Sequence, residues 1–387
     1  MTDTDYFRLQ LIVFALVSAS FTNVYITQPV LPVLQREFAT DLVVVSLSVS
    51  AVILGIALSN LPFGIVADRW PIQPIILVGG VMVAVGGFIC AATANLGILI
   101  GARFLQGLFI PALTTCLAAF LAKSLPATRL NVVMGSYVSA TVLGGLGGRL
   151  LGGWVHTLLS WRYAFVAAAM LILIAALTAL KWLPRAHPDV KQPQKTAGFR
   201  ALLKRGELLR IYLCAAGSFA IFSSVFNFLP YRLAAPPFNL STELITLLYL
   251  VYVMGIFTGP VSGRISNRFG SGNTLLGGSA VLAGALMLIL LPSIPAIVTG
   301  LIGICAGFFG VHAAAVGSLN RKLESGQGRA NALYVLFYYL GGWLGISLAG
   351  FAYKHYDWPA VVWMCVVLLS IPISTGISEK RHWLRPV

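Results

Sequence analysis

Long apolar segments separated by short polar ones run through the whole chain. A helix that spans a bilayer needs about 20 mostly apolar residues. Twelve segments meet this condition, and they begin near Phe7, Leu42, Pro74, Leu96, Leu130, Arg162, Leu209, Glu243, Thr274, Ala296, Ala330 and Pro359. We therefore predict an all-α integral membrane protein with 12 transmembrane helices.

One polar stretch divides these segments into two groups of six. It runs from Lys181 to Arg210, contains prolines and is strongly basic, whereas most other connections are very short. We expect an N-terminal six-helix half over residues 1–183, a cytoplasmic central loop over 184–208 and a C-terminal six-helix half over 209–387. The end of the loop, "FRALLKRGELLR", is either an amphipathic helix on the membrane surface or part of a flexible linker.

Composition and charge agree with a membrane protein. The chain is 58% hydrophobic and 10% charged, whereas soluble domains carry about 25% charged residues. If the N-terminus is cytoplasmic, 20 of the 26 Lys and Arg residues lie on the inner side, and the outer side keeps only Arg36, Arg162, Arg232 and Lys354. This bias predicts that both termini are cytoplasmic. The net charge of +15 then reflects topology and contact with the lipid bilayer, not binding to nucleic acid.

The cysteines and the short motifs exclude several classes of chemistry. The cysteines lie singly inside apolar segments at Cys90, Cys116, Cys214, Cys305 and Cys365, a pattern that favours neither a disulfide framework nor a metal site. The sequence contains no zinc-protease, nucleophile-elbow or phosphate-loop motif. We therefore expect no cofactor, no metal and no ATP drive, and a membrane-embedded enzyme is only a distant alternative. The apolar segment that begins near Phe7 reads as a retained helix and not as a signal peptide.

The same Gly-x-x-x-(Asp/Asn)-Arg spacing follows the second and the eighth apolar segments. Its members are Gly64, Asp68 and Arg69 in the first half and Gly263, Asn267 and Arg268 in the second. Two copies at equivalent places indicate the internal duplication that is typical of transporters. Asp68 could neutralise a helix N-terminus in the other half, so that the loop acts as a conformational latch. The alternative is an ordinary tight turn.

With these motifs the chain resembles the major facilitator superfamily (MFS) over essentially its whole length. The fourth segment, "RFLQGLFIPA", is similar to the family's Arg-x-x-Gln-Gly motif through Arg103, Gln106 and Gly107. The first, "YITQPVLPVL", resembles the twelve-helix drug/metabolite:proton antiporter branch. The glycines of the family's antiporter motif stand in register at Gly135, Gly144, Gly148, Gly152 and Gly153. The resemblance implies two pseudo-symmetric six-helix halves that transport small molecules by alternating access across a bacterial inner membrane.

The chain departs from the family pattern at two places. Arg149 stands where the antiporter motif has a proline, and Pro71, Ile72 and Gln73 stand where the family usually has a glycine and two basic residues. The first departure weakens the argument for antiport, and the second weakens the argument for a latch.

The fifth segment also carries a packing signal. Gly144, Gly148 and Gly152 are spaced by four residues, so they form one stripe along a helix, and Gly153 follows directly. Such a stripe lets another helix backbone approach closely. We expect a smooth contact between two helices that slide during transport.

Arg103 and Arg149 fall inside predicted spans, in the outer half of the membrane. An arginine at the centre of a span costs at least ~2.5–3.5 kcal/mol, so each must find partners. Gly145 and Gly153 leave the helix face of Arg149 bare, which makes room for a guanidinium that points at a cavity or at partner carbonyls. The alternative is that Arg149 snorkels outward or pairs with Glu37 or Glu243.

No acidic residue falls in the middle of a predicted span, and Glu379 is among the acids expected at the inner edge or in inner loops and tails. His312 is the only mid-membrane residue whose type suits a proton carrier, although it could equally be a histidine bonded within the core. Polar and aromatic residues such as Asn227 and Tyr338 could line a cavity for organic molecules, and several of this group could equally belong to an interfacial aromatic belt.

These features predict a monomeric secondary transporter that exports small organic compounds from the cytoplasm in exchange for protons. The expected substrate and proton pathway comprises Arg103, Gln106, Arg149, Asn227, His312 and Tyr338. An importer or facilitator of an organic anion is the alternative, because the interior charges are arginines and the antiporter motif is interrupted.

Overall fold

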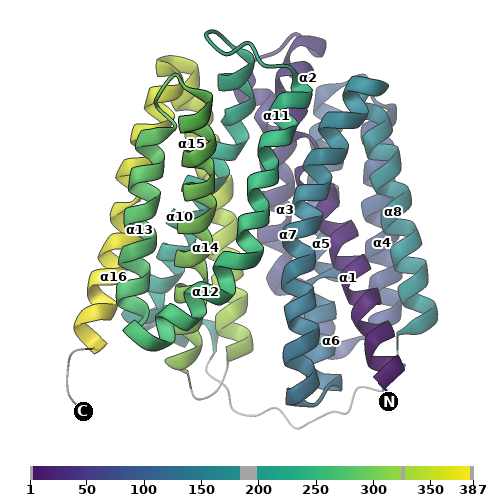
Figure 1. Cartoon of the computed structure of the whole chain (residues 1–387). Coiled ribbons are helices and arrows are strands. Elements are labelled where there is room, and N and C mark those ends of the chain that lie inside the picture. Colours follow the sequence, from purple (N-terminus) through teal and green to yellow (C-terminus); the bar gives the residue numbers. More distant parts are fainter. Residues whose placement is uncertain (1–2, 184–197, 324–326, 384–387) are drawn as a thin grey trace. The chain divides into compact units, whose positions relative to one another are not determined.

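A computed structural model of the chain describes residues 3–183, 198–323 and 327–383, and every regular element within these ranges is a helix (Figure 1). The chain divides into two compact units. The first comprises Met1–Lys191 with Ser241–Tyr249, and the second comprises Gln192–Leu240 with Leu250–Val387. Residues 184–197 of the expected central loop lie outside the described residues.

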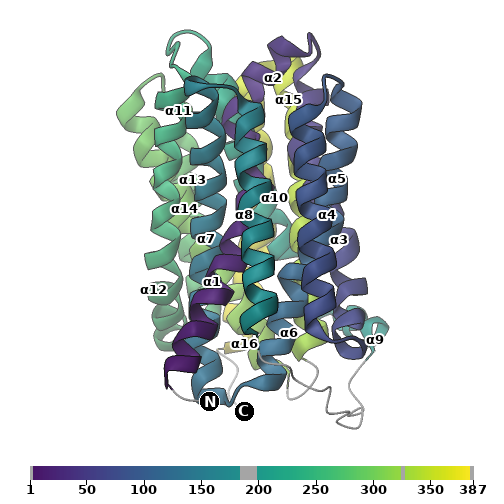
Figure 2. The ribbon, with the colours of Figure 1, turned by 90° about the vertical axis from the view of Figure 1, so that its right-hand side faces the viewer.

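The first unit contains the first six spans and one short later segment. Its helices are α1 (Asp3–Tyr25), α2 (Leu31–Glu37), α3 (Leu42–Arg69), α4 (Ile72–Ala92), α5 (Leu96–Leu113), α6 (Thr115–Ser124), α7 (Ala127–Leu158), α8 (Trp161–Trp182) and α11 (Thr242–Leu248). The 3₁₀ helix η1 (Gln28–Val30) joins α1 to α2. Within this unit α1 packs against both α7 and α8 (Figure 2).

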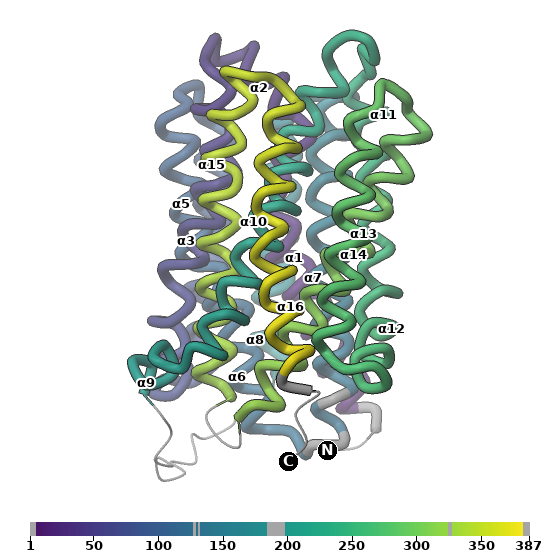
Figure 3. The backbone as a smooth tube through the Cα atoms, turned by 90° about the vertical axis from the view of Figure 1, so that its left-hand side faces the viewer, coloured from purple at the N-terminus to yellow at the C-terminus, as the bar shows by residue number. Residues whose placement is uncertain are grey.

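The second unit contains the remaining spans. Its helices are α9 (Phe199–Lys204), α10 (Gly206–Ala234), α12 (Met254–Phe269), α13 (Ser271–Leu288), α14 (Ile294–Arg321), α15 (Gln327–Leu368) and α16 (Ser370–Trp383). Here α10 packs along α15, and α13 packs against α14 and α16. The short α9 lies beside the first residues of α10 (Figure 3). The segment "FRALLKRGELLR" therefore does not form one amphipathic helix: α9 ends at Lys204, and the rest of the segment opens α10.

Several helices that follow a short connection begin with a side-chain N-cap. The carboxylate of Asp41 accepts a hydrogen bond from the Val43 amide at 2.7 Å at the start of α3. The side chain of Asn95 accepts one from the Ile98 amide at 3.1 Å at the start of α5. Such N-caps satisfy amide groups that have no partner inside the helix, so the polar residues between apolar segments fix where the spans start.

The described helices account for 12 membrane-crossing segments, as the sequence predicts. Ten ranges are long and apolar enough to cross a membrane, and the last of these, Gln327–Arg381, holds two crossings. They are joined at Tyr356 and Asp357, where Asp357 adopts a φ of 59° and interrupts the helical backbone. The remaining crossing is α7, which has 32 residues but is rich in glycine and in small polar residues.

The eighth crossing differs from an unbroken helix. It begins as α11, passes through the 3₁₀ helix η2 (Tyr249–Val253) and ends as α12. The boundary between the two units falls inside η2, between Tyr249 and Leu250.

Candidate functional site

The glycine stripe of α7 lies directly against α1. A methyl group added at Gly144 would lie 2.3 Å from the carbonyl oxygen of Ser18, and one added at Gly148 would lie 2.2 Å from that of Thr22. One turn further, a methyl group at Gly152 would lie 1.9 Å from the carbonyl oxygen of Ile26. Because these distances are far below van der Waals contact, only glycine permits this approach of the two backbones.

The other glycines of the motif have different surroundings. Gly153 faces α11, where an added methyl group would lie 1.9 Å from the hydroxyl oxygen of Thr246. Gly135 has open space around it. Four of the five motif glycines therefore serve close contacts of α7 within the first unit: two toward α1, one toward Ile26 directly after α1, and one toward α11.

The second unit repeats this arrangement, which sequence analysis missed. Gly341 and Gly345 of α15 lie against Ala216 and Ala220 of α10, and methyl groups there would approach to 2.2 Å and 2.6 Å. As the eleventh and seventh crossings, α15 and α10 correspond to α7 and α1 in the first unit. The signal that could have revealed this pair was the four-residue spacing in "GGWLG".

Arg149 lies inside the first unit and is 1% exposed, so it does not snorkel outward. Its Nε atom donates to Oε1 of Gln28 at 2.8 Å, and Nη1 donates to the carbonyl oxygen of Gly145 at 2.6 Å. The guanidinium carbon lies 4.0 Å from the centre of the Tyr25 ring and 5.4 Å from that of Tyr249. Arg149 is thus held by neutral acceptors and by aromatic faces that attract cations.

Glu37, one of the acids considered as a partner of Arg149, binds elsewhere. Its carboxylate accepts a hydrogen bond from Nε1 of Trp161 at 2.6 Å and pairs with Arg162 at 2.5 Å. Of the alternatives for Arg149, a pair with Glu37 is therefore not what the structure shows, because this carboxylate joins the end of α2 to the start of α8.

Arg103 binds partner carbonyls and is fully buried. Its Nε atom donates to the carbonyl oxygen of Ser48 at 2.9 Å, and Nη2 donates to that of Val24 at 2.5 Å. Nη1 donates to the carbonyl oxygen of Asn23 and to Oε1 of Gln106, each at 2.6 Å. Arg103 therefore joins α1, α3 and α5, and it does not face an open cavity.

The two interior arginines meet the same part of the first span. Arg103 binds the carbonyl groups of Asn23 and Val24, and Arg149 lies against Tyr25 and Gln28. These residues stand where α1 ends and η1 begins. The structure thus brings Arg103, Gln106 and Arg149 together around the point where the first helix is interrupted. Gln28, which sequence analysis did not single out, contributes a hydrogen-bond acceptor there.

The predicted latch residues lie in the last two turns of α3 and of α12. Asp68 pairs with Lys123 at 2.6 Å, and the two side chains are 69% and 55% exposed. Lys123 also donates to the carbonyl oxygen of Ala67 at 3.2 Å. A pair this exposed contributes little to stability, because water and salt screen it.

The counterpart in the second unit has other chemistry. Asn267 replaces the aspartate, and the guanidinium of Arg268 lies 5.1 Å from the centre of the Phe269 ring. Gly270 follows with a φ of 84°, which suits the residue after a helix end. Gly64 and Gly263 have open space around them, so neither glycine is required by close packing.

His312 lies on α14 and is half-buried, with Nδ1 2.9 Å from the Tyr334 hydroxyl of α15. The centre of its ring lies 5.3 Å from that of Tyr338, which stacks on Phe219 at 3.8 Å. Asn227 of α10 is fully buried. The histidine is therefore held by a tyrosine hydroxyl at the edge of an aromatic cluster formed by α10, α14 and α15.

Comparison with known proteins decides the family. The family model described as Major Facilitator Superfamily matches residues 13–321, which is more than half of the chain. The chain belongs to the Major Facilitator Superfamily. The protein is therefore a membrane-embedded transporter of small molecules and not an enzyme.

Relatives and solved structures cover nearly the whole length of this superfamily member. The inner membrane transport protein YnfM of Escherichia coli is 29% identical over 98% of this chain and 92% of its own. The uncharacterized MFS-type transporter YybF of Bacillus subtilis is 26% identical over 96% of both chains. A bacterial homologue of the human lysosomal transporter Spinster, in an inward-facing and occupied conformation, aligns with a TM-score of 0.79 at 14% identity and covers 98% of both chains.

Proposed function

We propose that this transporter exports small organic compounds from the cytoplasm in exchange for protons, by alternating access. The observation that carries the proposal is the glycine register of α7, in which Gly144 and Gly148 lie against the α1 backbone and Gly152 lies against the backbone of Ile26, directly after α1. The α15–α10 pair has the same kind of contact. Two glycine-lined helix pairs at equivalent places give each unit a smooth surface along which helices can shift.

His312 is the proposed proton-binding group. Imidazole is the side chain that changes charge near physiological pH, and the hydroxyl of Tyr334 gives Nδ1 a partner at 2.9 Å. Asn227 and Tyr338 are proposed to contact substrate, together with Gln106 and Arg149. Asp68 and Arg69, with Arg268 and Asn267 in the repeat, are proposed to act as the conformational latch.

The protein is proposed to work as a monomer in a bacterial inner membrane, with both termini and the central loop in the cytoplasm. The distribution of 20 basic residues on one side and four on the other supports this orientation.

A second candidate function is the import or facilitated diffusion of an organic anion. It is favoured by Arg149, which stands in place of the antiporter proline and donates hydrogen bonds to the neutral groups of Gln28 and Gly145. An anionic substrate that replaced one of these acceptors would gain a charge-assisted hydrogen bond.

Inside-out membrane vesicles test the export proposal. A panel of small organic compounds is added to vesicles that maintain an acidic interior, and a fluorescent probe reports the pH gradient. We expect an exported compound to release part of the gradient, and His312→Ala to abolish this release while exchange of labelled compound continues. Gradient release that is unchanged in His312→Ala would remove the histidine from the mechanism.

A further inference from the structure

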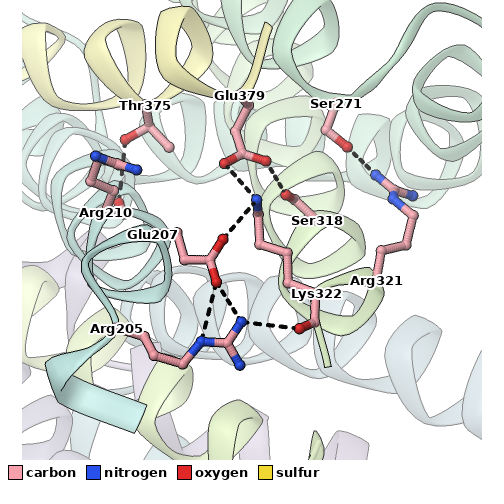
Figure 4. Close-up of polar contacts among 9 residues, drawn as sticks. All are labelled: Arg205, Glu207, Arg210, Ser271, Ser318, Arg321, Lys322, Thr375 and Glu379. Carbon is pink, nitrogen blue, oxygen red and sulfur yellow. Dashed lines mark hydrogen bonds and ion pairs between the residues drawn. The ribbon is translucent and has the colours of Figure 1, made fainter. Parts of the chain in front are cut away.

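A chain of alternating charges lies at one end of the second unit, where α9, α10, α14 and α16 meet (Figure 4). Arg205 pairs with Glu207, and Nζ of Lys322 lies 3.4 Å from Oε2 of Glu207 and 3.3 Å from Oε1 of Glu379. The Ser318 hydroxyl donates to the other oxygen of Glu379. Lys322 is therefore shared between two carboxylates.

The side chains of this charge chain differ in how deeply they are buried. Glu379 is 7% exposed, and it is the only buried acid among the side chains that the structure describes. The side chain of Lys322 is 18% exposed and that of Glu207 is 33% exposed. Glu207 also pairs with Arg205 and is partly exposed to water, so its charge is compensated without Lys322. Glu379 depends on Lys322, which is the only basic residue that pairs with it within the described part of the chain.

We propose that this charge chain is a fastener that holds the segment entering the second unit to the ends of α14 and α16. Lys322 is its central member. The ammonium group of Lys322 compensates the charge of Glu379, and the carbonyl oxygen of Lys322 accepts a hydrogen bond from Nη2 of Arg205 at 3.3 Å. Through Arg205 the fastener fixes the junction between α9 and α10, so the four helix ends move together. The proposal uses contacts within the second unit only and does not depend on the proposed function.

An ion pair of the first unit, between the ends of two helices, provides a contrast. The pair of Asp68 and Lys123 is exposed on both sides, and its residues come from α3 and α6. The pair of Asp68 and Lys123 therefore opens at little cost, whereas the buried charge of Glu379 requires its partner.

Because Glu379 is buried and Glu207 is not, substitutions of Lys322 and of Glu379 should have different effects. Lys322→Met leaves Glu379 as a buried, unpaired charge, and removing one partner of a buried pair is far more harmful than removing both. Glu379→Gln keeps an acceptor for Ser318 and leaves Lys322 with Glu207. We therefore expect Lys322→Met to be damaging, Glu379→Gln to be mild, and the double variant Lys322→Met/Glu379→Gln to regain most of what the first loses.

Hydrogen exchange of the full chain in detergent, measured by mass spectrometry, tests the fastener. We expect exchange over 199–210 to be roughly tenfold faster or more in Lys322→Met, and close to wild type in the double variant. Lys380→Met, which removes an exposed lysine next to Glu379, is the matched control and should change nothing.

Two results would overturn the proposal: exchange in Lys322→Met equal to that of Lys380→Met, or a double variant as fast as Lys322→Met. If Lys322→Met does not accumulate, the amount of protein in the membrane becomes the readout. Restored accumulation in the double variant then supports the fastener, and a failure to restore it contradicts the fastener.

Discussion

At the scale of single residues, the two interior arginines have different surroundings although both occupy predicted spans. All three nitrogens of Arg103 donate to backbone carbonyls or to Gln106 inside the first unit. Arg149 is held by Gln28, Gly145 and aromatic faces. Arg103 is therefore the better candidate for a structural role, and Arg149 for contact with a substrate.

Substitutions of Arg149 separate charge from geometry. Arg149→Lys keeps the charge but loses the planar fork that binds Gln28 and the aromatic rings, and Arg149→Pro restores the family's proline. We expect both variants to lose transport of the native substrate, with the lysine variant losing less. Transport assays at matched membrane levels measure this. Full activity of Arg149→Pro would contradict a role of Arg149 in substrate binding.

Residue-scale features divide into those that sequence could predict and those that it could not. The arginines, Gln106 and the glycine register were visible because they break an apolar pattern or repeat at a fixed spacing. Glu379 was placed only at the inner edge or in an inner loop or tail, and its burial was missed because burial there depends on Ser318 and Lys322, far away in sequence. A pattern within one helix cannot report which helices cover its end.

At the scale of helices, glycine contacts set how closely the spans approach. The starts of the crossings follow the apolar segments, because N-caps and prolines mark them. The η1 and η2 segments and the backbone turn at Asp357 were not predicted, since they depend on local conformations that an apolar pattern does not encode. The α10–α15 pair shows that the glycine contact belongs to the repeat and not to one motif.

Neighbouring glycines of α7 provide a matched test of this contact. Gly148→Ala places a methyl group 2.2 Å from the carbonyl oxygen of Thr22, whereas one at Gly147 has its closest neighbour at 3.6 Å. We expect Gly148→Ala to destabilise the protein by about 1–3 kcal/mol through overpacking, and Gly147→Ala to change stability by no more than ~0.5 kcal/mol. Thermal unfolding in detergent compares the two, and equal melting temperatures would contradict the close α1–α7 contact.

The end of α3, directly before the turn to α4, carries the latch prediction. Because the pair of Asp68 and Lys123 is exposed, Asp68→Asn should leave membrane levels unchanged and lower stability by no more than about 1 kcal/mol. We nevertheless expect impaired transport and a shift between conformational states in a cysteine-accessibility assay. Lys123→Gln is the control: an equal loss of transport would locate the effect in the pair itself, and unchanged transport in Asp68→Asn would reduce the loop to an ordinary turn.

At the scale of the whole molecule, the charge distribution predicts which side of the membrane each connection faces. Single cysteines at Lys204, next to the central loop, and at the exposed Leu159, after α7, report the two sides. Background labelling should be low, because all five native cysteines are buried. We expect an impermeant thiol reagent to label Leu159→Cys from outside the cell and Lys204→Cys only after the membrane is opened, and the reverse pattern would invert the topology.

We propose that a proton gradient drives transport by this protein. Purified protein in liposomes with an acidic interior, presented with a panel of labelled organic compounds, tests this proposal. We predict that at least one compound accumulates against its gradient, that a protonophore abolishes the accumulation, and that protein-free liposomes show none. Uptake that only equilibrates the compound, at a rate unaffected by the pH gradient or the protonophore, would contradict proton coupling and favour a facilitator.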